Sequence, residues 1–220
     1  MTGQEAGTEA TQTEPTPNYW CTWTTQGRML KTYQETGEIK FAGDQGIVGI
    51  RDNLNEQVLF REGAGWARAL YPESRSGLNF LLDDGWDVGY GLDPKRDGDQ
   101  FGSLILHPER FPSFPGTPPE RLHALARAVK DLGWAGLGLW VSPQMAGEKW
   151  GASPSPSVLY DDLWRKIGWC GEAGVAYLKV DWGLHCGDVA YRRKISEYAR
   201  ELAPGMLVEH CICGIPLNGV

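Results

Sequence analysis

The most informative segment of this 220-residue chain is LKVDWG at residues 178–183, a short apolar run that ends on charged and aromatic side chains. Side chains alternate along a strand, so Lys179 and Asp181 point to the same side of the strand that this run predicts. A neighbouring ammonium group favours the ionised form of a carboxyl group, which a nucleophile or a ligand requires. The segment therefore indicates either a charged site at a strand end or a structural ion pair.

Similar apolar runs recur along the chain and alternate with amphipathic helical patterns. Strands are expected at residues 18–24, 78–82, 136–141, 176–181 and 206–208. Helices are expected up to about residue 60, from a cap at residue 117 to about 132, and at about 159–173 and 188–203. This β-then-α order predicts an α/β fold with parallel strands and helical crossovers.

Two architectures satisfy that alternation, the doubly wound open sheet and the closed (β/α)8 barrel of TIM type. No Gly-x-Gly-x-x-Gly turn follows the first strand, which argues against a dinucleotide site. Asp and Trp residues gather just past the ends of several strands, where barrel enzymes build their active sites. The sequence therefore favours a barrel.

Composition and charge narrow the classes of function. The chain carries 21 basic and 28 acidic side chains, for a net charge of -7, and no basic run, so we expect no nucleic-acid partner. It has no apolar stretch of the roughly 20 residues that cross a bilayer and no signal-peptide pattern, which predicts a cytoplasmic protein without membrane contact. Its five cysteines include no Cys-x-x-Cys pair, so free thiols and no metal or cofactor are expected.

A second charged motif, DDGW at residues 83–86, directly follows the expected strand at 78–82. Two adjacent carboxylates can each accept several O–H donors, which suits a polyol ligand, although a solvated turn has the same composition. The chain also contains ten tryptophans, and flat apolar rings with one N–H are surfaces on which sugars stack or around which cores pack. The tail at residues 1–17, rich in Thr, Glu and Pro, is expected to be disordered, with a single unit from 18 to 220.

The order of these motifs resembles that of the α-galactosidase (melibiase) group of glycoside hydrolases, clan D, similar to families 27 and 36. An aromatic first strand, DDGW, Phe111-Pro112, GLGLW at 136–140 and LKVDW at 178–182 follow one another, and the similarity covers about residues 18–213. The resemblance implies a (β/α)8 barrel that hydrolyses α-linked oligosaccharides or glycosides with retention, by double displacement.

The resemblance also implies roles for individual residues. Asp181 would be the nucleophile, and Lys179 would hold a sugar hydroxyl and keep Asp181 ionised. Asp83 and Asp84 would grip hydroxyl groups at the closed end of the pocket. The remaining implied positions are three tryptophans that would wall the subsite and one acidic residue that would read the substrate: Trp86, Trp140, Trp182 and Glu209.

The resemblance fails at one essential point. A retaining glycosidase needs a second carboxyl group to protonate the leaving oxygen, and in this clan it lies at the end of strand six. The sequence shows five strands before Val220, so we expect the N-terminal part of a catalytic barrel. Alone, such an arc is predicted to have negligible activity, an uncovered apolar interior and poor solubility.

Two alternatives from other classes stay open. A non-catalytic carbohydrate-binding barrel would keep the same Trp and Asp residues. A metal-dependent barrel enzyme of enolase type would use Asp83, Asp181 and Glu209 as an oxygen cage for Mg²⁺, with a lysine as the base.

Overall fold

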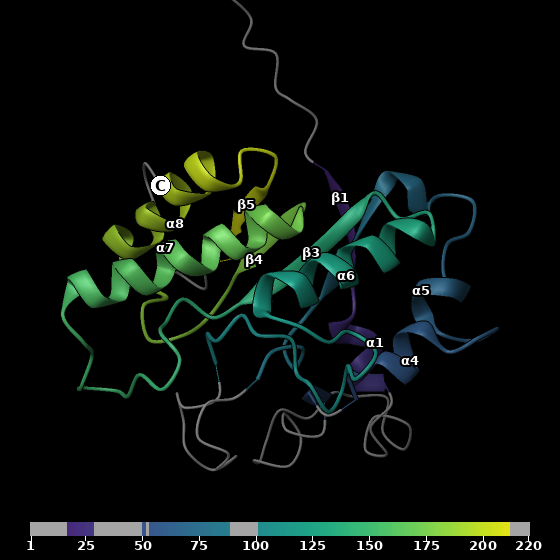
Figure 1. The fold of residues 1–220 in the computed structure, drawn as a ribbon, viewed down its shortest axis with the longest axis horizontal. Coiled ribbons are helices and arrows are strands. Elements are labelled where there is room, and N and C mark those ends of the chain that lie inside the picture. The colour runs from purple at the N-terminus through teal and green to yellow at the C-terminus, as the bar shows by residue number, and fades with distance from the viewer. Residues whose placement is uncertain (1–16, 29–49, 52, 89–100, 212–220) are drawn as a thin grey trace, which may run out of the picture.

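The computed structural model describes residues 17–28, 50–51, 53–88 and 101–211 (Figure 1). The predicted tail at 1–17 therefore lies outside the described residues except for Pro17. The remaining residues form one sheet with helices packed against it.

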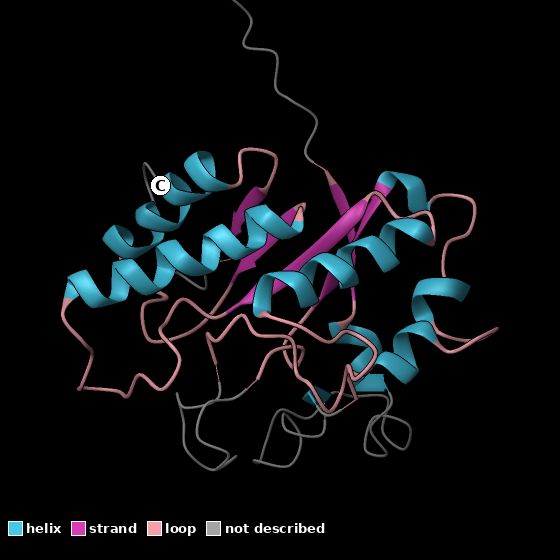
Figure 2. Cartoon of the chain, in the orientation of Figure 1, coloured by secondary structure: helices cyan, strands magenta, loops and turns pink. Residues whose placement is uncertain are grey.

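The sheet has five parallel strands whose spatial order is the same as their order along the chain. They are β1 (Asn18–Cys21), β2 (Leu78–Leu82), β3 (Gly136–Val141), β4 (Tyr177–Val180) and β5 (Leu207–His210). The sheet curls into a parallel half-barrel (Figure 2). A doubly wound sheet reverses its strand order at a switch point, and no reversal occurs among these strands. The structure thus confirms the predicted α/β alternation.

Helices connect the strands. Their bounds are α1 (Trp23–Arg28), α4 (Glu56–Phe60), α5 (Trp66–Ala69), the 3-10 turn η1 (Arg75–Gly77), α6 (Pro118–Asp131), α7 (Pro156–Ala173) and α8 (Val189–Leu202). None of the helices in the described part of the chain is long and apolar enough to cross a membrane.

The helix ends follow local chemistry. Thr117 and Glu120 form a capping box ahead of α6, and Asp188 caps α8 by accepting bonds from the amides of Ala190 and Tyr191. Helix α7 ends at Gly174, whose φ of 69° is left-handed and suits a residue without Cβ. The main error of the sequence prediction is the strand at 18–24, which ends at Cys21 because the chain turns into α1 at Trp23.

The apolar core lies between the sheet and the helices. The outward positions of β2 and β3 alternate with the inward ones and supply fully buried side chains to this core: Phe80, Leu82, Leu137 and Leu139. The opposite, inner face of the half-barrel mixes polar and apolar side chains at the alternate positions: Tyr19, Cys21, Asn79, Leu81, Trp140, Tyr177, Lys179, Leu207 and Glu209. Of the apolar inner side chains, Leu81 and Trp140 are buried and Leu207 is 47% exposed, so the expected uncovered apolar interior stays a prediction.

Candidate active site

A cavity of about 250 Å³ opens at the C-terminal ends of β2, β3 and β4. Parallel strands bring their carboxyl ends to one edge, so side chains far apart in sequence meet there. The lining residues are Trp23, Asp83, Asp84, Trp140, Lys179, Asp181 and Trp182. Six of these residues are ones that the sequence predicted for a site, and the structure brings them together around one space.

Asp83 is held by neighbours from three elements. Its Oδ2 accepts hydrogen bonds from Lys179 Nζ at 2.8 Å and from the Cys21 thiol at 3.0 Å. Its Oδ1 accepts from the amide of Asp84, and its own amide donates to Thr22 Oγ1. The side chain is only 4% exposed, so Asp83 is a fixed, buried acceptor.

Lys179 pairs with Asp83 more closely than with Asp181. Its Nζ lies 3.8 Å from Asp181 Oδ2, against 2.8 Å from Asp83 Oδ2. Burial alone would lower the pKa of Lys179, but the two carboxylates outweigh it and raise that pKa above its ordinary value. Lys179 is therefore a cation that links the ends of β2 and β4.

Asp181 is the accessible carboxylate of the cavity. Its side chain is 25% exposed, whereas those of Asp83 and Asp84 are 4% and 3% exposed. The indole N–H of Trp140 donates to Asp181 Oδ2 at 3.0 Å, and the Asp181 amide donates to the carbonyl of Val141. A bond from an N–H to an ionised oxygen orients the carboxylate and leaves Oδ1 available.

Asp84 is buried beside Arg51. Arg51 Nε donates to Asp84 Oδ1 at 2.7 Å, while Asp84 Oδ2 is buried and has no hydrogen-bond partner among the described residues. Burial raises the pKa of Asp84 to about 7, Arg51 opposes that rise, and the nearby Asp87 adds to it. Near neutral pH this carboxyl group exists in both protonation states, so it can donate or accept a proton in a hydrogen bond.

Aromatic rings form one side of the cavity mouth. Trp182 is 48% exposed, and its ring lies 6.1 Å from that of Trp140, which is nearly buried. Phe101 packs edge-on against both, at 4.7 Å from Trp182 and 6.0 Å from Trp140. The guanidinium of Arg51 lies over the Phe101 ring at 4.4 Å, which ties the aromatic wall to the buried ion pair.

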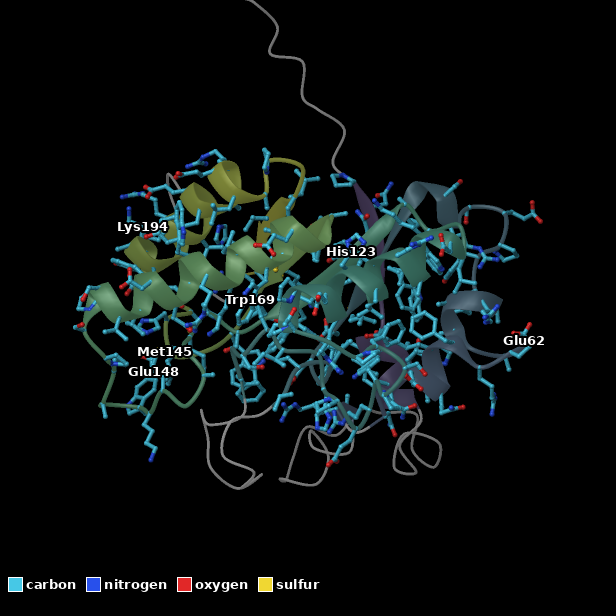
Figure 3. The ribbon with its side chains drawn as sticks, in the orientation of Figure 1. Glu62, His123, Met145, Glu148, Trp169 and Lys194 are labelled. Atoms are coloured by element: carbon cyan, nitrogen blue, oxygen red, sulfur yellow. The ribbon has the colours of Figure 1, made fainter. Side chains whose placement is uncertain are left out.

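The loop that carries Trp182 is fastened to the loop after β3. Glu148 Oε1 lies 2.8 Å from His185 Nε2, and its other oxygen accepts from the amide of Met145. Figure 3 shows Met145 and Glu148 close together on the loop after β3. The Glu148 side chain is fully buried, so this contact fixes both loops at the rim of the cavity.

Two predicted site residues do not line the cavity. Trp86 is 0% exposed in the core, and its indole N–H donates to the carbonyl of Trp140 at 2.7 Å, so it supports the end of β3 from behind. Glu209 lies beside Lys179 in the register of β4 and β5, but its oxygens accept from Tyr177 OH and the Cys211 thiol.

Three further residues belong to the site and were not predicted for it: Trp23, Arg51 and Phe101. Trp23 was assigned to the first strand, whereas α1 carries it into the cavity lining. Arg51 and Phe101 come from connecting segments that gave no sequence signal, because their importance arises from contacts with Asp84 and Trp182.

Metal coordination has no geometric support in the described part of the chain, where no group of three or more His, Cys, Asp or Glu side chains is placed to hold an ion. His210 accepts from Arg192 at Nδ1, which leaves the Nε2 hydrogen for Ser196. Burial and the Arg192 charge lower the pKa of His210 to about 4, so it is neutral.

Comparison of the chain with protein-family models, with curated proteins and with solved structures returned no match.

Proposed function

We propose that this chain carries the nucleophile of a retaining α-glycosidase of the α-galactosidase type, built on a (β/α)8 barrel. The observation that supports the proposal most directly is the accessibility of Asp181. It is the most exposed of the three carboxylates that line one cavity, and a second group, the Trp140 indole, orients it. A nucleophile must reach the anomeric carbon, and the buried carboxylates of Asp83 and Asp84 cannot do so without moving.

The chemistry follows from the positions of the groups. Asp181 attacks the anomeric carbon of an α-linked glycoside, and the electron pair of the broken bond leaves with the departing oxygen. The product is a β-glycosyl ester on Asp181, which water then hydrolyses with overall retention. Lys179, Asp83 and Asp84 supply ionic and hydrogen-bonding groups to the sugar hydroxyls, and Trp182 offers an exposed ring for stacking.

The acid that protonates the leaving oxygen is not assigned to any described residue. In a retaining enzyme the two carboxyl groups stand about 5–5.5 Å apart across the bond that breaks. Asp83 is occupied by Lys179 and Cys21, and Asp84 by Arg51, so both lie on the buried side of the cavity. The proposal therefore predicts a strong dependence on leaving-group quality, since a substrate that needs no acid can still react with Asp181.

The test uses 5-fluoro-α-galactosyl fluoride, whose fluoride leaves without protonation and whose ring fluorine slows release of the sugar. The 220-residue chain, and any longer protein that contains it, is incubated with the reagent and analysed by intact mass and peptide mapping. We expect one glycosyl group on Asp181. The Asp181→Asn variant is expected to remain unlabelled, and Asp161→Asn, which changes an exposed carboxylate on α7, is expected to label normally.

Labelling of another carboxylate, or equal labelling of the Asp181→Asn variant, would contradict the assignment. The polar cavity and the exposed ring of Trp182 at its mouth also support a second function, that of a carbohydrate-binding barrel. Saturable binding of methyl α-galactoside without any covalent product would favour that second function.

The metal-dependent alternative requires Asp83, Asp181 and Glu209 to share one ion. Glu209 instead binds Tyr177 and Cys211 and does not line the cavity. We expect labelling of Asp181 to be unchanged after treatment with EDTA, and a loss of labelling that Mg²⁺ restores would revive the metal-dependent reading.

A further inference from the structure

Arg192 is a buried cation with an unusual set of partners. Its side chain belongs to α8 and is 0% exposed, yet no carboxylate lies within ion-pair distance of it among the described residues. Burying an unpaired charge is unfavourable, and apolar replacements of buried ionic groups are often neutral or stabilising. An arginine at this position therefore calls for an explanation beyond packing.

The five N–H donors of Arg192 all reach acceptors at the ends of β4 and β5 or in the loop after β4. Its Nη2 donates to the carbonyl oxygens of Asp181 at 2.6 Å and Cys211 at 3.2 Å. Its Nη1 donates to the Val180 carbonyl at 3.1 Å and lies 3.4 Å from His210 Nδ1. Its Nε donates to the Cys186 carbonyl in the loop after β4 at 2.6 Å. One planar guanidinium thus binds two strand ends and the following loop.

Asp181 is held by hydrogen bonds at its amide, its carbonyl and its carboxylate. Its amide is bound by the carbonyl of Val141, its carbonyl by Arg192, and its carboxylate by the Trp140 indole. Val180, which precedes it, accepts from both Arg192 and the amide of Cys211. The backbone on both sides of the carboxylate is therefore held before any substrate binds.

We propose that Arg192 is a positioning residue for Asp181, a role that rests on the proposed function of Asp181 as nucleophile. Arg192 holds the peptide of Asp181 through its guanidinium fork and keeps the carboxylate in register with the Trp140 indole. Lysine cannot replace it, because an ammonium group has three donors on one atom and cannot span four carbonyl groups. Misplacement of a reacting group by about 1 Å can lower a rate by roughly 100-fold.

The first measurement needs no activity. The indole N–H signal of Trp140, assigned with Trp140→Phe, reports the hydrogen bond to Asp181 Oδ2 in a ¹H–¹⁵N spectrum. We expect Arg192→Met and Arg192→Lys to shift this signal, and we expect no shift in Arg200→Met, which removes an exposed arginine from the same helix. If neither Arg192 variant moves the signal more than the control does, the proposal is wrong.

The second measurement compares reaction with binding. With 5-fluoro-α-galactosyl fluoride, we expect the first-order labelling rate of Arg192→Met to fall about 100-fold, while the dissociation constant of methyl α-galactoside changes less than about threefold. A merely structural role would instead weaken binding, thermal stability and labelling in parallel, and that result would overturn the proposal.

Two outcomes keep the positioning role and the proposed function apart. If Arg192→Met does not fold, Arg192→Lys decides, with an expected loss in labelling rate of about tenfold or more and refutation by a wild-type rate. If the wild-type chain is never labelled at Asp181, the proposed function fails, and the indole signal alone decides whether Arg192 positions the residue.

Discussion

Asp84 gives the most quantitative prediction, because its burial couples folding to pH. Its pKa is about 7 in the folded chain, against about 3.9 for an unperturbed aspartate, and burial is the main cause. A carboxyl group whose pKa is higher in the folded chain than in the unfolded chain makes its full contribution to stability at pH values below its unfolded pKa. This contribution is lost as the pH rises to the folded pKa. For Asp84 the loss therefore takes place between about pH 4 and pH 7.

The size of this effect follows from the difference between the two pKa values. Roughly 3 pKa units at about 1.4 kcal/mol each give on the order of 4 kcal/mol of unfolding free energy lost across that range. The Asp84→Asn substitution removes the titration and keeps an amide oxygen for Arg51 Nε. We therefore expect the stability of Asp84→Asn relative to wild type to increase with pH, by about 1.4 kcal/mol per unit between about pH 4 and pH 7.

Urea denaturation followed by tryptophan fluorescence at about pH 4.5, 6 and 8 measures this difference. Asp161→Asn serves as the matched control, because its carboxylate is exposed on α7 and its difference from wild type is expected to vary little with pH. A difference between Asp84→Asn and wild type that stays constant over the same range would show that Asp84 is not protonated on folding, and the argument from burial would fail.

Three further substitutions test one hydrogen bond and the space around two glycines of α7. Trp140→Phe removes the N–H donor to Asp181 Oδ2. Because a hydrogen bond to a charged group is worth about 1.5–3 kcal/mol, we expect labelling by 5-fluoro-α-galactosyl fluoride to slow by roughly 10- to 100-fold. An unchanged labelling rate would count against this contact. Gly171→Ala places a Cβ about 2.1 Å from the Leu202 carbonyl, so thermal denaturation is expected to show a lower Tm. Gly168→Ala on the same helix meets nothing within 4 Å and is expected to gain about 0.5–1 kcal/mol from helix propensity, so equal effects of the two glycine substitutions would refute the steric argument.

The strand ends were the part of the fold that the sequence predicted best. An apolar run that stops on charged residues identifies both a buried strand and its carboxyl edge, which is why Asp83 and Asp181 could be placed at one site. The helix α1 was missed because Thr22, Trp23 and Thr24 favour strands on propensity alone. Tertiary contacts decide there: Thr22 accepts from the amide of Asp83 and donates to Gln26, which lies within α1.

The placement of Trp86 could not be predicted from its neighbours. Asp84 lines the cavity and Trp86 lies in the core, because the chain turns sharply at Gly85 between them. Gly85 has a φ of 114°, and a Cβ there would stand 2.5 Å from the carbonyl of Arg51. The direction of Trp86 thus depends on a close approach to residue 51, which a reading of DDGW alone does not contain.

The partner of Lys179 shows a similar limit. The spacing along β4 suggested a pair with Asp181, but the stronger contact crosses the sheet to Asp83. Alternation identifies the face on which a side chain lies, and only the curvature of the sheet decides which neighbour it reaches. Lys179 therefore pairs mainly with the buried carboxylate of Asp83, and the indole N–H of Trp140 orients the carboxylate of Asp181.

The outward face of the half-barrel packs against the helices, and the inward face carries the candidate site. The outward face packs apolar residues such as Leu139 and Leu178, both 0% exposed, against the helices, so substitutions there act mainly on stability. The inward face holds the ionic contacts of Lys179 with Asp83 and Asp181, which lie at the cavity. Arg192 connects the two, since it starts in the helical layer and ends on the carbonyl of Asp181. A change in helix α8 can thus reach the candidate nucleophile directly, without altering any residue that lines the cavity.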